Sequence, residues 1–250
     1  MARFYIAPEH WDLERLRILG PEAHHCRDVL RMAPGDTATV FNGQGLKAEV
    51  ELLSVRRDLV ECRCLSWNQE PEPARRVTLA QAIPKGKNME WILEKATELG
   101  AGAIVPLLTT RTVVQLDERE ALRKQEKWQR VVIEAAKQCG QNWLPKVELP
   151  QKIETLLATP RADDLRLIAS LGPAARHFKT VLAQRPRTAL KPILVCIGPE
   201  GDFTPAELAF AEKQGCAPVT LGNIILRTET AAMYCLSVLA HELGAEVDAD

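Results

Sequence analysis

Along the first 67 residues or so, apolar and polar positions alternate in short runs. Residues 37–45, 46–55 and 59–67 each follow this pattern, and turn-forming residues separate them. Alternation with a period of two is typical of half-buried β-strands. Three short strands cannot close a core alone, so residues 3–7 are expected to add an edge strand. The pattern predicts a small β-rich domain at the amino-terminal end.

The pattern changes after a polar stretch with two prolines at 68–76, which is expected to be a linker. Helical patterns then appear at 88–100 and 126–140, and each ends in a glycine. Between and after them lie apolar runs, several of them apolar on both faces, as in parallel strands covered by helices. These runs are 77–83, 102–108, 165–171, 192–198 and 217–222. The alternation predicts an α/β domain, so the chain is expected to divide into residues 1–70 and 71–250.

The composition of the chain excludes several classes of protein. The chain has 250 residues, of which 46% are apolar, and its net charge is −1. A strongly basic nucleic-acid binder is therefore excluded, and any RNA contact must come from local basic patches. Seven cysteines, an odd number without a C-x-x-C pair, fit reduced thiols. With no apolar run near the length of a membrane helix and no signal-peptide pattern at its start, the protein is expected to be cytoplasmic.

One strand-to-helix junction has the composition of a ligand-binding loop. Residues 197–208 read IGPEGDFTPAEL, and they follow an uninterrupted apolar run. Thr204 and Glu207 form a T-x-x-E capping box, which predicts a helix start. The loop before it lies at the carboxyl edge of the predicted sheet, where α/β proteins bind ligands, and Gly198 and Gly201 let the backbone pass close to a ligand or adopt a positive φ. A plain turn with an exposed carboxylate is the alternative.

A second candidate lies near the end of the chain, in LGNIILRTETAAMYCLSVLAHEL at 221–243. Arg227 and Glu229 follow an apolar loop and stand at the start of a predicted helix. They fit a reactive site, or a capping ion pair in which the helix dipole favours Glu229 and Arg227 is its partner. Dinucleotide, P-loop, serine-hydrolase and zinc-protease motifs are absent. No metal is expected, because the adjacent residues His24, His25 and Cys26 make a poor ligand set without a second cluster.

Taken together, IGPEGDFTPAE and LGNIILRTETA resemble the paired signature of the RsmE family of 16S rRNA uridine-N3 methyltransferases, a branch of the SPOUT superfamily. Residues 24–36, 41–45, 85–114 and 135–147 resemble further blocks of that family in the same order. The resemblance covers nearly the whole chain. Two departures are Gln141, where family members often carry arginine, and Asn223, where they often carry arginine or a similar polar residue.

The resemblance implies a PUA-like RNA-binding β-barrel at residues 1–70 and a SPOUT α/β methyltransferase domain with a trefoil knot at 71–250. It implies S-adenosylmethionine as the cofactor, a homodimer, and a uridine near the 3′ end of small-subunit rRNA as the substrate. Neither a metal nor a membrane is implied. Two other functions stay open: a SPOUT ribose 2′-O-methyltransferase, and a noncatalytic RNA-binding or assembly factor.

The resemblance also implies roles for individual residues. Arg227 would bind the uracil oxygens and stabilise charge, while Glu200 or Glu229 would accept the N3 proton or orient Arg227. The expected cofactor-binding residues are Leu171, Gly172, Gly198, Glu200, Gly201, Leu221, Gly222, Ile225 and Leu226. The expected RNA-binding residues are Arg3, His24, His25, Arg27, Arg31, Lys85, Lys87 and Arg111.

Overall fold

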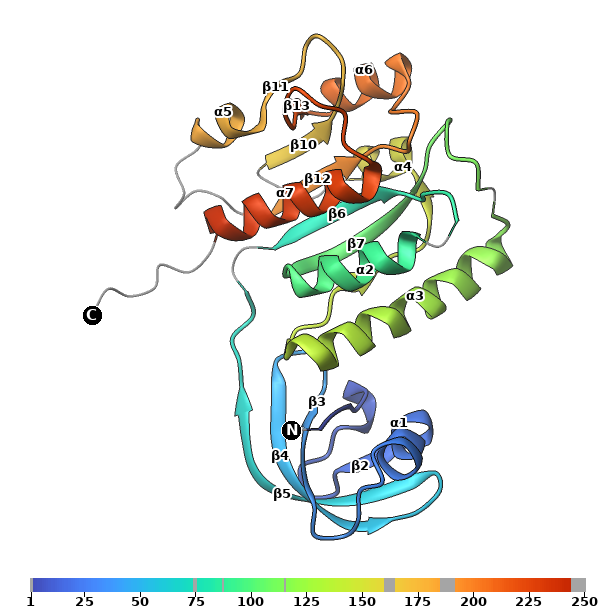
Figure 1. Ribbon diagram of the computed structural model, residues 1–250, viewed down its shortest axis with the longest axis vertical. Coiled ribbons are helices and arrows are strands. Elements are labelled where there is room, and N and C mark those ends of the chain that lie inside the picture. Colours follow the sequence, from blue (N-terminus) through green and yellow to red (C-terminus); the bar gives the residue numbers. More distant parts are fainter. Residues whose placement is uncertain are drawn as a thin grey trace, which may run out of the picture. The chain divides into compact units, whose positions relative to one another are not determined.

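The computed structural model describes residues 2–73, 76–86, 88–114, 116–159, 165–184 and 192–243 (Figure 1). It divides into two compact units. The first unit comprises residues 1–72 and 133–144, and the second unit comprises 73–132 and 145–250. The first unit therefore includes a segment from the middle of the chain. The two functional domains at 1–70 and 71–250 stay a prediction.

The first unit is built on a five-stranded sheet with the order β1-β3-β4-β5-β2. The three predicted strands pair antiparallel as β3, β4 and β5, and β1 is the predicted edge strand, parallel to β3. The strands are β1 Arg3–Tyr5, β2 Arg17–Leu19, β3 Thr37–Phe41, β4 Leu46–Val55 and β5 Leu59–Gln69. β5 runs two residues into the expected linker. The sequence pattern missed β2 and the short helices that flank it, η1 Pro8–His10, α1 Gly20–His24 and the π-helical η2 His25–Val29.

One face of this sheet forms the core of the first unit. Alternate residues of β4, Ala48, Val50 and Leu52, are buried, as the period-two pattern requires. They pack with Phe4 and Ile18 from the two edge strands. Each fully buried aliphatic or aromatic side chain contributes roughly 1.5–3 kcal/mol by leaving water.

The segment 133–144 is fastened to this unit by polar contacts. Lys137 Nζ lies 2.8 Å from Glu22 Oε1, and both side chains are largely buried. Burial lowers the pKa of Lys137, but hydrogen bonds to Glu22 and Glu134 outweigh it, so the net pKa is raised. The ammonium group is therefore held in its charged form.

The second unit contains an eight-stranded sheet with the order β11-β13-β10-β12-β6-β7-β8, and β9 also pairs with β7. Within the described residues, its strands pair in parallel. The strands are β6 Val77–Ala82, β7 Ala101–Leu108, β8 Lys146–Val147, β9 Gln151–Lys152, β10 Leu165–Ala169, β11 Arg176–His177, β12 Ile193–Ile197 and β13 Cys216–Thr220. Every residue of β6 and β12 is buried, which confirms the prediction of strands covered on both faces.

Helices alternate with these strands along the chain. They are α2 Asn88–Glu98, α3 Glu118–Cys139, α4 Ile153–Ala158, α5 Phe178–Ala183, α6 Pro205–Lys213 and α7 Thr228–Leu243. The carboxyl-terminal end of α3 belongs to the first unit. α7 packs against β6 and β12, and α2 lies beside it (Figure 1). α6 packs against β13 and α4. Among the described residues, no helix is both long and apolar enough to cross a membrane.

The strand order brings three distant loops together. β10 pairs with β12 on one side and with β13 on the other. Since the three strands are parallel, the loops that follow them leave the same edge of the sheet. Ligands of open α/β sheets bind at such an edge, where neighbouring strands are not consecutive in sequence.

Candidate active site

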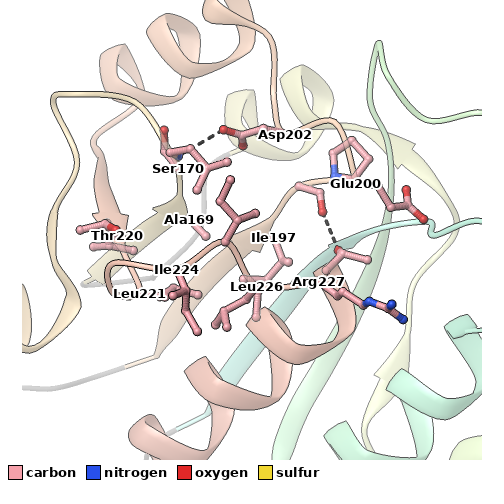
Figure 2. A pocket seen from close by; sticks show the side chains of 17 residues that line it. Ala169, Ser170, Ile197, Glu200, Asp202, Thr220, Leu221, Ile224, Leu226 and Arg227 are labelled. Atoms are coloured by element: carbon pink, nitrogen blue, oxygen red, sulfur yellow. Dashed lines mark hydrogen bonds between the residues drawn. The ribbon is translucent and has the colours of Figure 1, made fainter.

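The loops after β10, β12 and β13 enclose a pocket, together with the start of α7 (Figure 2). The structure brings together seven of the predicted site residues in its lining. They are Leu171, Gly198, Glu200, Leu221, Ile225, Leu226 and Arg227. Gly172, Gly201, Gly222 and Glu229 belong to the same segments but are not among the lining residues. Sequence reasoning missed Ser170, Asp202, Thr220, Ile224 and Thr228, which also line the pocket.

Asp202 joins two of the pocket loops. Its Oδ2 accepts a hydrogen bond of 3.2 Å from the backbone N–H of Leu171, and its Oδ1 accepts one of 2.8 Å from Phe203. Figure 2 shows the contact between the loops as a dashed line. The residue has a φ of 60°, a left-handed conformation that aspartate tolerates better than most side chains. Asp202 thus fixes the loop after β10 to the loop after β12.

Of the two reasons expected for the glycines of this loop, the positive φ is wrong, and the close approach to a ligand stays a prediction. Neither Gly198 nor Gly201 has a positive φ, which in this loop belongs to Asp202. A Cβ on Gly198 would lie 3.2 Å from the ring of Phe203 and 3.3 Å from its backbone nitrogen. Phe203 is buried in the core, so Gly198 is required for internal packing at this point.

The predicted capping box at the start of α6 is confirmed, and it also anchors a neighbouring loop. Thr204 Oγ1 accepts from the Glu207 N–H at 3.2 Å, and Glu207 Oε2 accepts from the Thr204 N–H at 2.7 Å. Glu207 Oε1 accepts from the N–H and the hydroxyl of Thr110, at 2.8 Å and 3.1 Å. Burial raises the pKa of this carboxyl, but the hydrogen bonds from Thr110 and Thr204 outweigh it and lower the pKa.

Two basic residues lie on loops attached to the GPEG segment. Glu200 Oε1 accepts a hydrogen bond of 3.0 Å from the backbone N–H of Lys85. The Arg111 guanidinium donates to the backbone carbonyl of Gly201. Lys85 and Arg111 are both exposed. The pocket loop is therefore connected to two loops that carry exposed positive charge.

Arg227 stands at the end of the pocket wall, just before α7. Its side chain is exposed, and Figure 2 shows the guanidinium pointing away from the apolar residues Leu221 and Ile224, on the side where Glu200 lies. Glu229 lies in the first turn of α7, where the helix dipole favours a carboxylate. In the part of the chain that the structure describes, Arg227 and Glu229 form no ion pair, so the ion-pair alternative fails.

Most of the RNA-binding candidates in the first unit have internal partners. Arg3 donates to the Gln141 carbonyl at 3.1 Å and to Asn142 Oδ1 at 2.9 Å. The remaining candidates are placed as follows: His24 lies between Asp28 and Asp58, Arg27 pairs with Asp28, the ring of His25 contacts Phe4, and Arg31 is exposed. Lys87 lies outside the described residues.

In the His-His-Cys run, His24 is in contact with Asp28 and Asp58. Within the described ranges, no three His, Cys, Asp or Glu residues are grouped as metal ligands. The departure Asn223 is exposed on the pocket loop, while the backbone of Gln141 is a partner of Arg3.

Comparison with known proteins identifies the family. A family model described as RNA methyltransferase domain matches residues 70–240, and one described as RNA methyltransferase PUA domain matches residues 18–64. The chain is 34% identical to Ribosomal RNA small subunit methyltransferase E of Bacillus subtilis, over 97% of both chains.

Solved structures agree with this match. A protein from Legionella pneumophila, solved in complex with the cofactor S-adenosylmethionine, has a TM-score of 0.86 and 31% identity over 96% of this chain and 97% of that one. Ribosomal RNA small subunit methyltransferase E from Neisseria gonorrhoeae, bound to S-adenosylmethionine, has a TM-score of 0.84 and 29% identity over 96% of both. The chain therefore belongs to the family of ribosomal RNA small subunit methyltransferase E, with an RNA methyltransferase domain and a PUA domain.

Proposed function

We propose that this protein catalyses the S-adenosylmethionine-dependent methylation of N3 of a uridine in the 16S rRNA of the small ribosomal subunit. The observation that carries the proposal is the pocket at the ends of β10, β12 and β13, which has Glu200 and Arg227 in its lining. This pocket occurs in a chain that matches a named small-subunit rRNA methyltransferase over 97% of its length.

The composition of the pocket fits the cofactor. Leu171, Ile224 and Ile225 line it and are 59%, 74% and 79% exposed, which is a large apolar area for a soluble ligand to cover. A flat adenine ring fits such a surface, and backbone groups of the loops can bind its nitrogens. Of the predicted cofactor residues, the lining ones would contact the cofactor, and Gly172, Gly201 and Gly222 would shape the loops. When bound, the cofactor supplies an activated methyl group on a sulfonium.

The reaction leaves two tasks to the protein. The uracil must be held with N3 in line with the methyl group, which can be worth roughly 7–11 kcal/mol of the barrier. The N3 proton must also be removed, which makes the ring anionic. Arg227 would donate hydrogen bonds to a uracil oxygen and stabilise that charge. Glu200 lines the pocket and Glu229 does not, so Glu200 is the better placed of the two proposed proton acceptors.

The wider organisation belongs to the same proposal. The PUA domain would bind RNA, and Lys85 and Arg111 would contact the RNA beside the pocket. Lys87 lies outside the described residues and stays a candidate for RNA binding. The methyltransferase domain would form a trefoil knot and pair with a second copy of the chain in a homodimer. The enzyme would act in the cytoplasm. These statements rest on the family, and sedimentation of the purified protein tests the homodimer.

Transfer of label from S-adenosylmethionine tests the proposal. Small subunits from cells that lack the modification are the substrate, and 16S rRNA is isolated afterwards. The wild type should label it, and Ile225→Glu should bind the cofactor more weakly, since the charge lies where the ring is expected to pack. Ile225 is exposed, so folding is not affected. Cofactor binding without label in 16S rRNA would favour a noncatalytic RNA-binding factor.

A further inference from the structure

A buried amide lies behind the pocket. Gln81 is in β6, paired with Ile197 of β12 and Pro106 of β7, and its exposed fraction is 0%. It does not line the pocket. A polar side chain in such an apolar sheet is costly unless its groups are hydrogen-bonded. Gln81 Oε1 nonetheless has no hydrogen-bond partner in the described part of the chain. The hydrogen bonds of this amide are therefore those that its nitrogen makes.

These bonds form a directed chain across the site. Gln81 Nε2 donates to the Ala82 carbonyl and to Thr228 Oγ1, both at 2.9 Å. Thr228 Oγ1 donates to the Gly198 carbonyl at 2.6 Å. A hydroxyl has one proton, and a carbonyl only accepts, so that proton is committed to Gly198. The other partner of Thr228 must then be a donor, which a glutamine amide provides and a carboxylate does not.

These hydrogen bonds connect two walls of the pocket to the sheet. Gly198 directly follows β12 and lines the pocket, and Thr228 begins α7 directly after Arg227. The Arg227 carbonyl accepts the first-turn hydrogen bond of α7 from Ala231 N at 2.8 Å. The hydrogen bonds of Thr228 thus lie at the first turn of α7, next to Arg227.

We propose that Gln81 is a positioning residue for the methyl transfer, which acts through Thr228 to hold Arg227 and the Gly198 loop in register. This inference rests on the proposed function. Gln81 touches neither substrate nor cofactor. Its loss would let the first turn of α7 shift, and a misplacement of about 1 Å can cost about 10²-fold in rate.

Substitutions of Gln81 and Thr228 distinguish the effect of the lost hydrogen-bond donor from the effect of altered packing. Gln81→Glu keeps the size and shape but replaces the donor with an acceptor, and Gln81→Leu removes both. Both should lower kcat by about 10–100-fold, since positioning is lost, while the Kd for S-adenosylmethionine stays within about threefold. Thr228→Val should match them, and Thr228→Ser, which keeps the hydroxyl, should restore kcat. The double variant Gln81→Leu/Thr228→Val should lose no more than Thr228→Val alone.

Thr97→Val is the matched control. Thr97 is fully buried in α2 and donates its hydroxyl to the Leu93 carbonyl at 2.8 Å, so this change also removes a buried hydroxyl–carbonyl bond. It should lower stability and leave kcat unchanged. Hydrogen exchange gives a readout independent of turnover. The Ala231 amide should exchange faster in Gln81→Leu and Thr228→Val than in the wild type or in Thr97→Val.

The outcomes are distinct. If the wild type methylates small subunits but Gln81→Glu and Thr228→Val keep full kcat, the inference is wrong and the proposed function stands. Equal losses of kcat in Thr97→Val would also overturn it, because they would show a general effect of stability. If the wild type does not methylate, the proposed function fails, and exchange at Ala231 still decides whether the chain of bonds holds α7.

Discussion

Arg227 is the residue on which the proposed chemistry depends most. It lines the pocket, it is exposed, and it comes directly before the helix that Gln81 and Thr228 hold in place. A cation at this point is able to meet a uracil oxygen that gains negative charge. The cofactor would instead contact the apolar residues of the loops. Stabilisation of the uracil anion and binding of the cofactor would thus depend on different side chains.

Arg227→Ala should therefore lower kcat by about 10²–10³-fold, the range seen when one donor to a developing oxyanion is removed. The Kd for S-adenosylmethionine, measured by titration calorimetry, should change little. Arg227→Lys is the matched control and should recover part of the rate, because it keeps the charge but not the planar donor group. Normal turnover at saturating cofactor, together with a large loss of cofactor binding, would refute this role.

Glu207 predicts a pH effect on stability. The pKa of this carboxyl is lowered in the folded protein, so its contribution is present above the ordinary value of 4.5 and is lost as the pH falls through the folded pKa. Glu207→Gln should lower the free energy of unfolding at pH 7 by about 1–3 kcal/mol, because glutamine keeps only one acceptor oxygen and the donors of either Thr110 or Thr204 then lose their partner. The difference in the free energy of unfolding between Glu207→Gln and the wild type should become smaller below pH 4.5. Denaturant titrations at several pH values measure this difference. A difference independent of pH would contradict the assignment.

For single residues, the sequence predicted contacts between near neighbours better than contacts between distant residues. The capping box was predictable because Thr204 and Glu207 are three positions apart. The contact between Gln81 and Thr228 was not, because 147 positions separate them and only the strand order brings them together. Gly198 carried a signal for an unusual backbone, yet its absent side chain is explained by Phe203. The positive φ in that loop belongs to an aspartate, for which sequence gives little warning.

At the scale of elements, length determines what the apolar pattern can reveal. The five predicted strands of the second unit are present as β6, β7, β10, β12 and β13. Strands β8, β9 and β11 have two residues each, too few for any period to appear. α3 begins at Glu118, eight residues before the predicted start, because its first two turns are mostly charged and show little apolar periodicity. A local signal was present, since Asp117 and Glu120 bond each other's backbone N–H groups as a capping box does.

The end of α3 gives a prediction about the first unit. Lys137 is bound by Glu22, whose other oxygen accepts from the Tyr5 N–H at 3.2 Å. Lys137→Met keeps the length of the side chain but leaves Glu22 without its cation, so the free energy of unfolding should fall by about 3 kcal/mol. Thermal denaturation measures the loss. Lys127→Met is the control, since Lys127 pairs with Glu90 on the surface and should contribute little. Similar losses in both variants would show that burial of the Lys137–Glu22 pair is not decisive.

At the scale of the whole molecule, the order of the strands was beyond the sequence pattern. Runs of apolar residues predict that a parallel sheet exists, but they do not say which strands are neighbours. The adjacency of β10, β12 and β13 is what makes a pocket from loops at 170, 198 and 221. The trefoil knot is also beyond what apolar patterns can predict, and it stays a prediction from the family resemblance alone.

The net charge of −1 predicts a preference in substrate. A protein with almost no net charge has little overall attraction for free RNA, so binding should depend on shape and on several local contacts. Assembled small subunits should therefore be methylated faster than naked 16S rRNA at physiological salt. Initial rates at equal concentrations of the two substrates measure this directly. Equal rates would contradict it.

The central claim is that the pocket directs a methyl group to N3 of uridine. The most direct measurement is nucleoside analysis of 16S rRNA by mass spectrometry, after small subunits lacking the modification are incubated with the protein and labelled S-adenosylmethionine. We predict label in 3-methyluridine with the wild type and a loss of at least about 10²-fold in rate with Arg227→Ala. Label in a 2′-O-methyl nucleoside would contradict the claim, because the acceptor would then be a ribose hydroxyl and Arg227 would have no uracil anion to stabilise.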